Sequence, residues 1–277
     1  MKLLKSKILI IVVLLILFVA GGNIYCNLTV FHNVTALKKD ITDVIDINKT
    51  RTQKDYALIY EQTGVAPALA KQIIESGSSP KLLELQSHLF EPKDYEREYI
   101  FFPTTAEERS KSKTPIVPLK NGDILITFNT HTLFWRHGHC AIVTDADNGE
   151  VLEHRSIGNV SSFGYSSYWG TYPAFVILRH DDAKKAEMAA KYAKDSLVGI
   201  DYNLFAGVLK KDKSDEDKPS SSQCSHIVWQ AFKSAGVDID SDGGFLVTPH
   251  DVAMSDELSV IQLFGLDGDD FSDRVLK

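Results

Sequence analysis

The sequence has few cysteines, three among 277 residues, at Cys26, Cys140 and Cys224. Three cysteines are too few, and an odd number, for a domain that is cross-linked by several disulfides. A single Cys140–Cys224 bridge is compatible with an oxidising compartment, but an odd number of thiols leaves at least one free to react. The hydrophobic share of 44% is sufficient for a sizeable core without such bridges.

The chain also lacks an excess of positive charge. Its formal net charge is −7 and its pI is about 5.7. Nucleic-acid-binding domains carry a basic face, so no nucleic-acid partner is expected. No internal repeat stands out, and the length leaves room for one main domain beside smaller N-terminal segments.

One apolar run stands out, from Ile8 to Ala20, and three lysines precede it. A basic start followed by an apolar run is typical of an export signal. The run is shorter than the ~20 residues of a full membrane span, although the segment 21–25 extends it. Residues 1–26 are therefore a cleaved signal peptide or a retained membrane anchor, with the anchor preferred. Either outcome places the rest of the chain outside the cytoplasm, membrane-anchored or secreted.

Residues 27–97 are predicted to form a helical spacer or cap. Apolar residues recur at helical spacing from Val34 to Ile45, and further helices are expected at 55–62, 67–75 and 80–90. The segment 98–118 is polar and contains several prolines, which predicts a linker. Within this region, the charged run 107–113 is expected to be a solvated loop or a short helix.

The pattern changes to strands in the region 119–277. Short apolar runs between turn residues predict strands at 123–128, 139–144, 150–154, 174–178 and 258–264. A helix is expected at 181–197, and Thr248 followed by Pro249 is typical of the start of another. Together these elements predict an α+β fold, an antiparallel sheet packed against helices.

A polar serine run ends at Cys224, where a helical pattern begins. Cys224, Val228, Ala231 and Ala235 lie on one helical face, and Gly236 is a fitting C′ residue. Cys224 thus lies in the first turn, where free N–H groups and the macrodipole favour a thiolate and so a nucleophile. The alternative is a small buried residue, because free cysteines are often buried.

A cysteine nucleophile needs a base and a group that orients the base. His139, at the start of a strand, is the candidate base, and Glu153 on the next strand is the candidate orienting carboxylate, ahead of Asp145 and His154. If His139 meets Cys224, strand alternation turns Cys140 away as a structural residue. The alternatives are a packed histidine and an ordinary exposed glutamate.

Two further possibilities concern metal and substrate binding. His131, His137 and His139 lack a nearby carboxylate pair and match no strong zinc pattern, so neither a metal nor another cofactor is expected. Tyr202 either contributes its hydroxyl to an oxyanion site or fills core. The charged segment Lys210–Ser222 is expected to be a loop before the Cys224 helix.

The order of these motifs resembles the circularly permuted branch of the NlpC-type, papain-like cysteine hydrolases, the YiiX/YebB-like group. The resemblance covers roughly residues 119–264. The motifs that carry it are Gly122-Asp123-Ile124-Leu125, Gly138-His139-Cys140-Ala141-Ile142-Val143, Leu152-Glu153, Tyr202-Asn203 and Cys224-Ser225. As in that branch, the histidine strand precedes the cysteine helix. Two departures are Gln223, where relatives often have an aromatic residue, and the long charged loop before it.

The resemblance implies a permuted papain-like domain at 119–277. In that domain Cys224 is the nucleophile, His139 the base, Glu153 the third polar residue and Tyr202 a residue lining the site. The implied reaction is hydrolysis of an amide through an acyl-enzyme, with cell-wall peptides as the expected substrate. The alternatives are an acyl or lipid amidase or thioesterase of the same fold, and a binding module whose cysteine is inert.

Overall fold

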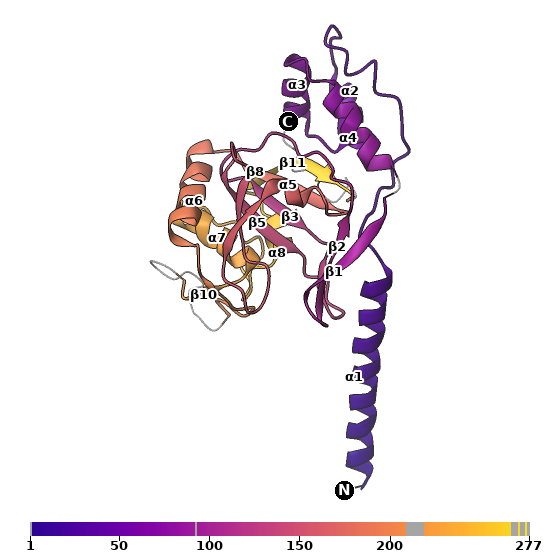
Figure 1. The fold of residues 1–277 in the computed structure, drawn as a ribbon, viewed down its shortest axis with the longest axis vertical. Helices are drawn as coiled ribbons and strands as arrows, with labels where there is room; N and C mark the ends of the chain where they lie inside the picture. The colour runs from indigo at the N-terminus through magenta and orange to yellow at the C-terminus, as the bar shows by residue number, and fades with distance from the viewer. Residues whose placement is uncertain (1, 92, 209–218, 267–270, 272–274, 276–277) are drawn as a thin grey trace.

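The centre of the protein is a six-stranded antiparallel sheet in a computed structural model that describes residues 2–91, 93–208, 219–266, 271 and 275 (Figure 1). The strand order is β11-β8-β3-β5-β6-β7. In that order the strands are Leu258–Phe264, Phe175–His180, Ile124–Thr127, His139–Asp145, Glu150–Glu153 and Ser162–Tyr165. The α+β class with antiparallel strands is confirmed, as are the five strands predicted from apolar runs.

Three helices cover one face of this sheet. They are α6 (Ala183–Ser196), α7 (Cys224–Ser234) and α8 (Pro249–Ala253). The predicted starts of α7 at Cys224 and of α8 at Pro249 are confirmed, with Thr248 accepting a hydrogen bond from the Asp251 N–H. Gly236 follows α7 with φ of 75°, which glycine adopts at little cost.

The opposite face carries the N-terminal helical region. Its helices are α2 (Gln53–Thr63), α3 (Pro67–Glu75) and α4 (Pro80–Phe90), and their buried residues share one core cluster with Leu125, Ala141 and Val143 of the sheet. Proline stands at the first position of α3 and α4, where its missing N–H is no loss. The region therefore packs on the sheet as a cap.

The helix predicted from Val34 to Ile45 is wrong. This stretch is irregular up to Ile41 and forms turns from Thr42 to Ile45, although Ile41, Val44 and Ile45 are buried as their spacing suggested. The Asp40 carboxylate accepts a hydrogen bond from the Thr42 N–H. Such local side-chain bonds offer the backbone an alternative to helix.

The solvated loop or short helix predicted at 107–113 is wrong for residues 107–110, whereas 111–113 are an exposed loop. Strands β1 (Tyr95–Phe101), β2 (Thr105–Ser110) and β4 (Thr130–Thr132) form a second antiparallel sheet, in which every residue of β2 is buried. The charges of β2 can be buried because they are paired: Glu107 binds Arg109, and Glu108 binds Arg136.

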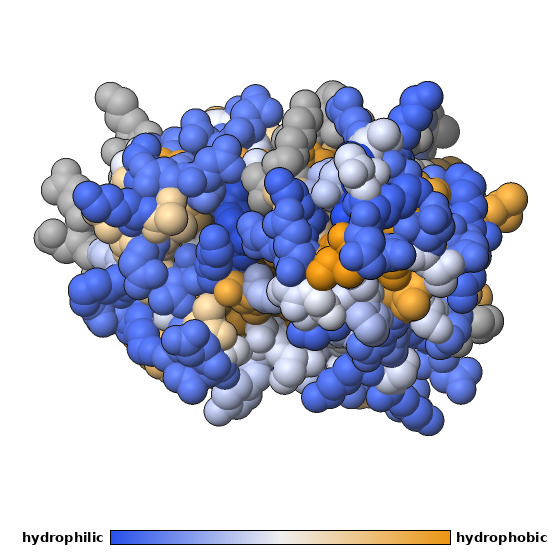
Figure 2. Space-filling model, turned by 90° about the horizontal axis from the view of Figure 1, so that it is seen from above, coloured by the Kyte–Doolittle hydropathy of each residue, from blue (hydrophilic) through white to orange (hydrophobic). Residues whose placement is uncertain are grey.

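Helix α1 (Lys2–Leu28) extends away from the sheets at the end opposite α2–α4 (Figure 1). Residues Lys7–Leu28 form a 22-residue stretch long and apolar enough to cross a membrane, a property that signal sequences share. The end of the molecule far from α1 is instead dominated by hydrophilic residues with scattered apolar patches (Figure 2). The distribution of polarity is thus uneven between the two ends.

Three short elements complete the fold. Helix α5 (Ser166–Trp169) follows β7, and the two-residue strands β9 (Asp201–Tyr202) and β10 (Ser221–Ser222) pair in parallel just before α7. Most of the charged loop expected at Lys210–Ser222 lies outside the described residues.

Candidate active site

The fold brings Cys224, His139 and Glu153 together at one end of the main sheet. His139 is the first residue of β5, Glu153 the last of β6, and Cys224 the first of α7. Glu153 pairs with Ala141 across the antiparallel ladder, and Ala141 shares a strand face with His139. The carboxylate therefore lies on the same side of the sheet as the imidazole, with Glu153 Oε2 2.8 Å from His139 Nε2.

The imidazole of His139 is held on two further sides. Its ring stacks on the indole of Trp169 with centroids 5.3 Å apart and planes 13° from parallel. Because Nε2 is committed to Glu153, Nδ1 is the nitrogen left for the Cys224 thiol, the ring's other polar neighbour. The ring is only 3% exposed, so its orientation is fixed by packing as well as by hydrogen bonds.

The protonation of His139 follows from these contacts. Burial alone would lower the pKa of the imidazole, but hydrogen bonding to Cys224 and Glu153, together with their negative charge, outweighs burial and raises the pKa to about 9. The ring is therefore cationic at neutral pH. The imidazolium therefore places a positive charge beside the Cys224 side chain.

The first turn of α7 provides the second source of positive potential at the sulfur. The Gln223 side chain caps the helix by accepting from the Ser225 N–H at 3.0 Å, while its own Nε2 donates to the Val247 carbonyl at 2.7 Å. Within the described residues, the Cys224 N–H has no hydrogen-bond partner. An unpaired N–H at a helix start is suited to bind a developing oxyanion.

The expectation that Cys140 points away from Cys224 is wrong. Cys140 lies in the same core cluster as Cys224, on the sheet face covered by α7, and burial raises the pKa of its thiol well above the ordinary range. His139 is the first residue of β5 and Cys224 the first residue of α7. The two side chains therefore meet at the end of the sheet and not across one of its faces. All three cysteines are free, so no Cys140–Cys224 bridge is present.

Tyr202 lies beside the sulfur on β9. Burial and the nearby Cys224 raise the pKa of the phenol. Its ring meets the imidazole of His154 edge to face at 4.9 Å. The two other candidates for the orienting group have different partners. His154 contacts Tyr202, and Asp145 lies at the far end of β5, where it binds Asn148.

A buried charged cluster around Glu107 lies next to Trp169, the residue on which His139 stacks. Tyr172, which packs against Trp169, donates to Glu107 Oε2 at 2.7 Å, and Arg109 and Arg155 bind Oε1 of the same carboxylate at 2.9 and 2.5 Å. Burial alone would raise the pKa of Glu107, but the two arginines and the Tyr172 hydroxyl outweigh it and lower the pKa. This cluster was not predicted from the sequence. Its signal in the sequence is that Glu107 and Arg109 carry opposite charges two positions apart, the spacing of side chains on one face of a strand.

The three histidines weighed as metal ligands have separate partners. His131 Nε2 lies 3.7 Å from Glu108, and His137 bonds to Thr132 and to the Gly138 carbonyl. Burial lowers the pKa of His137 to about 4. Among the described residues, the group whose ligand atoms converge is instead Asp240, Asp242 and Asp251.

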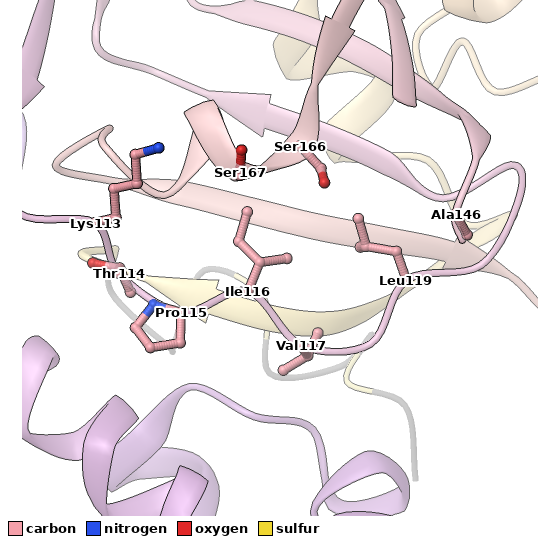
Figure 3. Close-up of a pocket in the computed structure, with 9 residues that line it drawn as sticks. All are labelled: Lys113, Thr114, Pro115, Ile116, Val117, Leu119, Ala146, Ser166 and Ser167. Atoms are coloured by element: carbon pink, nitrogen blue, oxygen red, sulfur yellow. The ribbon is translucent and has the colours of Figure 1, made fainter. Parts of the chain in front are cut away.

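A cavity of about 400 Å³ lies elsewhere in the domain, between the segment 113–119 and α5. Figure 3 shows Ser166 and Ser167 of α5 on one side and Ile116 and Leu119 on the other. Neither Cys224, His139 nor Glu153 lines it. The cavity is therefore distinct from the candidate site, where Cys224 is 7% exposed.

No family model and no solved structure matches the chain. Over 141 residues the chain is 29% identical to the uncharacterized protein YycO of Bacillus subtilis, a match that covers 50% of this chain and 54% of that protein. The chain thus spans about half the length of this relative.

Proposed function

We propose that the protein is an extracytoplasmic cysteine hydrolase of the permuted papain-like type, which cleaves an amide bond through an acyl-enzyme. One observation carries this proposal: the imidazole of His139 lies between the thiol of Cys224 and the carboxylate of Glu153, 2.8 Å from the latter. A thiol, a base and a group orienting the base are what nucleophilic catalysis requires.

The proposed reaction has two steps. The Cys224 thiolate attacks the substrate carbonyl, and the N–H of Cys224 stabilises the resulting oxyanion. The C–N bond then breaks as the His139 imidazolium donates its proton to the leaving amine, which leaves a thioester on Cys224. A water molecule, deprotonated by His139, attacks the thioester and releases the acid and the thiol.

Cell-wall peptides are the substrate class we propose first, because the apolar N-terminal helix is consistent with export. A second candidate, an acyl or lipid amide or a thioester, is favoured by the exposed aromatic residues Phe134 and Trp135. They precede His139 by only five and four positions. Their exposed side chains therefore form an apolar surface near the site. Tyr202, beside the sulfur, is proposed to line the substrate site.

We further propose that α1 is retained as a membrane anchor. Arg97 donates to the carbonyl oxygens of Cys26 and Asn27 at the end of the helix, and its guanidinium lies 3.7 Å from the buried Glu108. Cys26 is itself buried, with its thiol donating to the Phe134 carbonyl at 3.5 Å. Cleavage after residue 20 or 22 would leave these contacts in place but would remove Phe18, whose ring packs on that of Phe134 at 5.3 Å.

Thiol alkylation across pH tests the nucleophile. With iodoacetamide on the full chain in detergent, Cys224 should react faster at pH 6 than an unperturbed thiol, whose pKa is near 8.5. A C224A variant is the blank for the buried Cys26 and Cys140. If Cys224 reacts no faster than an ordinary thiol, the inert binding module is the correct alternative.

Two substrate panels then separate the candidate substrates. Release of new amino groups from purified peptidoglycan supports a cell-wall amidase, whereas turnover of acyl amides or thioesters supports the lipid alternative. The C224A variant should be inactive in either assay.

A further inference from the structure

Two neighbouring segments beside α1 expose aromatic side chains. The aromatic loop, residues 133–135, follows β4 on the way to β5, and the hairpin tip, residues 102–104, joins β1 to β2. Phe102 is 78% exposed, and Phe134 and Trp135 are 41% and 42% exposed. The Leu133 N–H donates to the Thr104 carbonyl at 2.8 Å, so the two segments form one surface. Clustered exposed apolar residues of this kind mark an interaction site.

The aromatic loop packs directly on α1. The ring of Phe134 meets that of Phe18 at 5.3 Å, and a Cβ placed on Gly22 would come within 2.4 Å of the Phe134 Cβ. Leu133 lines an apolar pocket with residues of α1, namely Leu15, Ile16, Val19, Ala20 and Asn23. The loop therefore lies alongside the apolar part of the helix rather than beyond its end.

The depth of the loop relative to α1 is fixed by charged residues. The buried carboxylate of Glu108 lies 2.7 Å from Arg136 and 3.7 Å from Arg97. Both arginines also donate to carbonyl oxygens at the end of α1: Arg97 to those of Cys26 and Asn27, and both to that of Thr29. The helix and the domain are thus joined by a network that resists sliding of one along the other.

The backbone of the aromatic loop is suited to an apolar medium. Thr132 and Trp135 exchange two N–H to carbonyl bonds of 2.9 Å, and the carbonyls of Leu133 and Phe134 contact the His131 ring and the Cys26 thiol. Irregular backbone is tolerated at membrane depth only when its polar groups find partners within the protein. Leu133 also has a φ of 51°, a conformation that costs free energy and must be held by these contacts.

We propose that the aromatic loop and the hairpin tip enter the outer leaflet of the bilayer that α1 spans. Phe18 lies ten positions before Leu28, which corresponds to about 15 Å of helix, and the hydrocarbon core is about 30 Å thick, so a loop beside Phe18 reaches lipid. Trp135 stands where interfacial tryptophans are enriched. The proposal rests on α1 being a retained anchor and is independent of the cysteine chemistry.

This placement brings the candidate site to the membrane surface. Trp135 precedes His139 by four positions, and a chain of that length spans at most about 14 Å. His139 therefore lies close above the lipid–water boundary. The hydrophilic end of the molecule faces the opposite way, into water (Figure 2).

Tryptophan fluorescence tests the insertion. Trp169 and Trp229 are 1% and 3% exposed, so Trp135 is the tryptophan that lipid can reach. With the full chain reconstituted in phosphatidylcholine vesicles, lipids brominated on their acyl chains should quench a substantial part of the emission. The W135F variant should lose that quenching, and C224A should keep it.

A second reporter and a matched control complete the experiment. In the W135F background, F102W should restore quenching, whereas L83W, at an exposed position of α4, should not. The mass of the recovered chain shows whether α1 is present. Retained α1 with Trp135 unquenched by brominated lipid would overturn this proposal alone. A mature chain without α1 would overturn the anchor as well and leave the cysteine chemistry standing.

Discussion

The Nε2 atom of His139 lies 2.8 Å from the Oε2 atom of Glu153, which leaves Nδ1 for the sulfur of Cys224. This contact fixes the orientation of the ring and, together with the contact to Cys224, favours its charged form. A carboxylate on Nε2 fixes the ring orientation toward the thiol and stabilises the imidazolium. Most of the proposed chemistry depends on this arrangement.

Replacing Glu153 by glutamine should lower kcat/KM by roughly 10²–10⁴-fold, the range that general acid–base catalysis contributes, because His139 depends on Glu153 for its orientation and charge. The amide keeps the size of the side chain but removes its charge and allows the wrong tautomer of His139. E150Q, on the same strand but bonded to Lys194, is the matched control and should retain activity. Similar rates for the two variants would show that Glu153 does not support the base.

The pH dependence of kcat/KM should carry an alkaline limb near pH 9. The imidazolium must be present to protonate the leaving group, and contacts with Cys224 and Glu153 raise the pKa of His139 to about 9. Activity should therefore hold through neutral pH and fall as pH rises through 9. In E153Q one of the interactions that raises this pKa is gone, so the limb should move to lower pH. An alkaline limb that stays in place in E153Q would contradict the assigned contact.

Gly164 should act as a positioning residue for Glu153. A Cβ at Gly164, on β7, would lie 2.6 Å from Glu153 Oε1. This contact is too close, and the flexible end of the Glu153 side chain would move away to relieve it. G164A should therefore turn the carboxylate from His139, reduce kcat/KM and shift the alkaline limb in the same direction as E153Q. S162A, at an exposed neighbouring position of β7, should change neither quantity. Loss of activity without a shift of the limb would indicate damage to the sheet instead.

Removal of the buried carboxylate behind the site should cost stability. E107A leaves Arg109 and Arg155 without their common partner, and breaking a buried ion pair in this way costs about 3–5 kcal/mol of unfolding free energy. Chemical denaturation measures the loss. The control is E96A, which removes the largely exposed pair with Lys111 and should leave the midpoint unchanged. Equal midpoints for E107A and the unmodified chain would show that the cluster is dispensable.

The sequence predicted those parts of the molecule that are set locally. The helix start at Cys224, the strand start at His139 and the hairpin bearing Glu153 are short-range patterns, and all three elements are present. The buried strand β2 was missed because its charges find partners far along the chain, such as Arg136 and Arg155. The helix expected at 34–45 failed because aspartate side chains favour turns there. Contacts between distant segments are not visible in a local pattern.

The packing of α1 on the aromatic loop gives the last prediction. A side chain at Gly22 would collide with Phe134, whereas nothing lies within 4 Å of a Cβ at Gly21. G22L should force the loop from the helix and reduce the quenching of Trp135 by acyl-brominated lipid. G21L adds the same bulk one residue away and should leave that quenching unchanged. Both variants lengthen the apolar run equally, so a difference between them reports the contact rather than the hydrophobicity of the span. Equal quenching in G22L and G21L would show that α1 does not hold the loop in the bilayer.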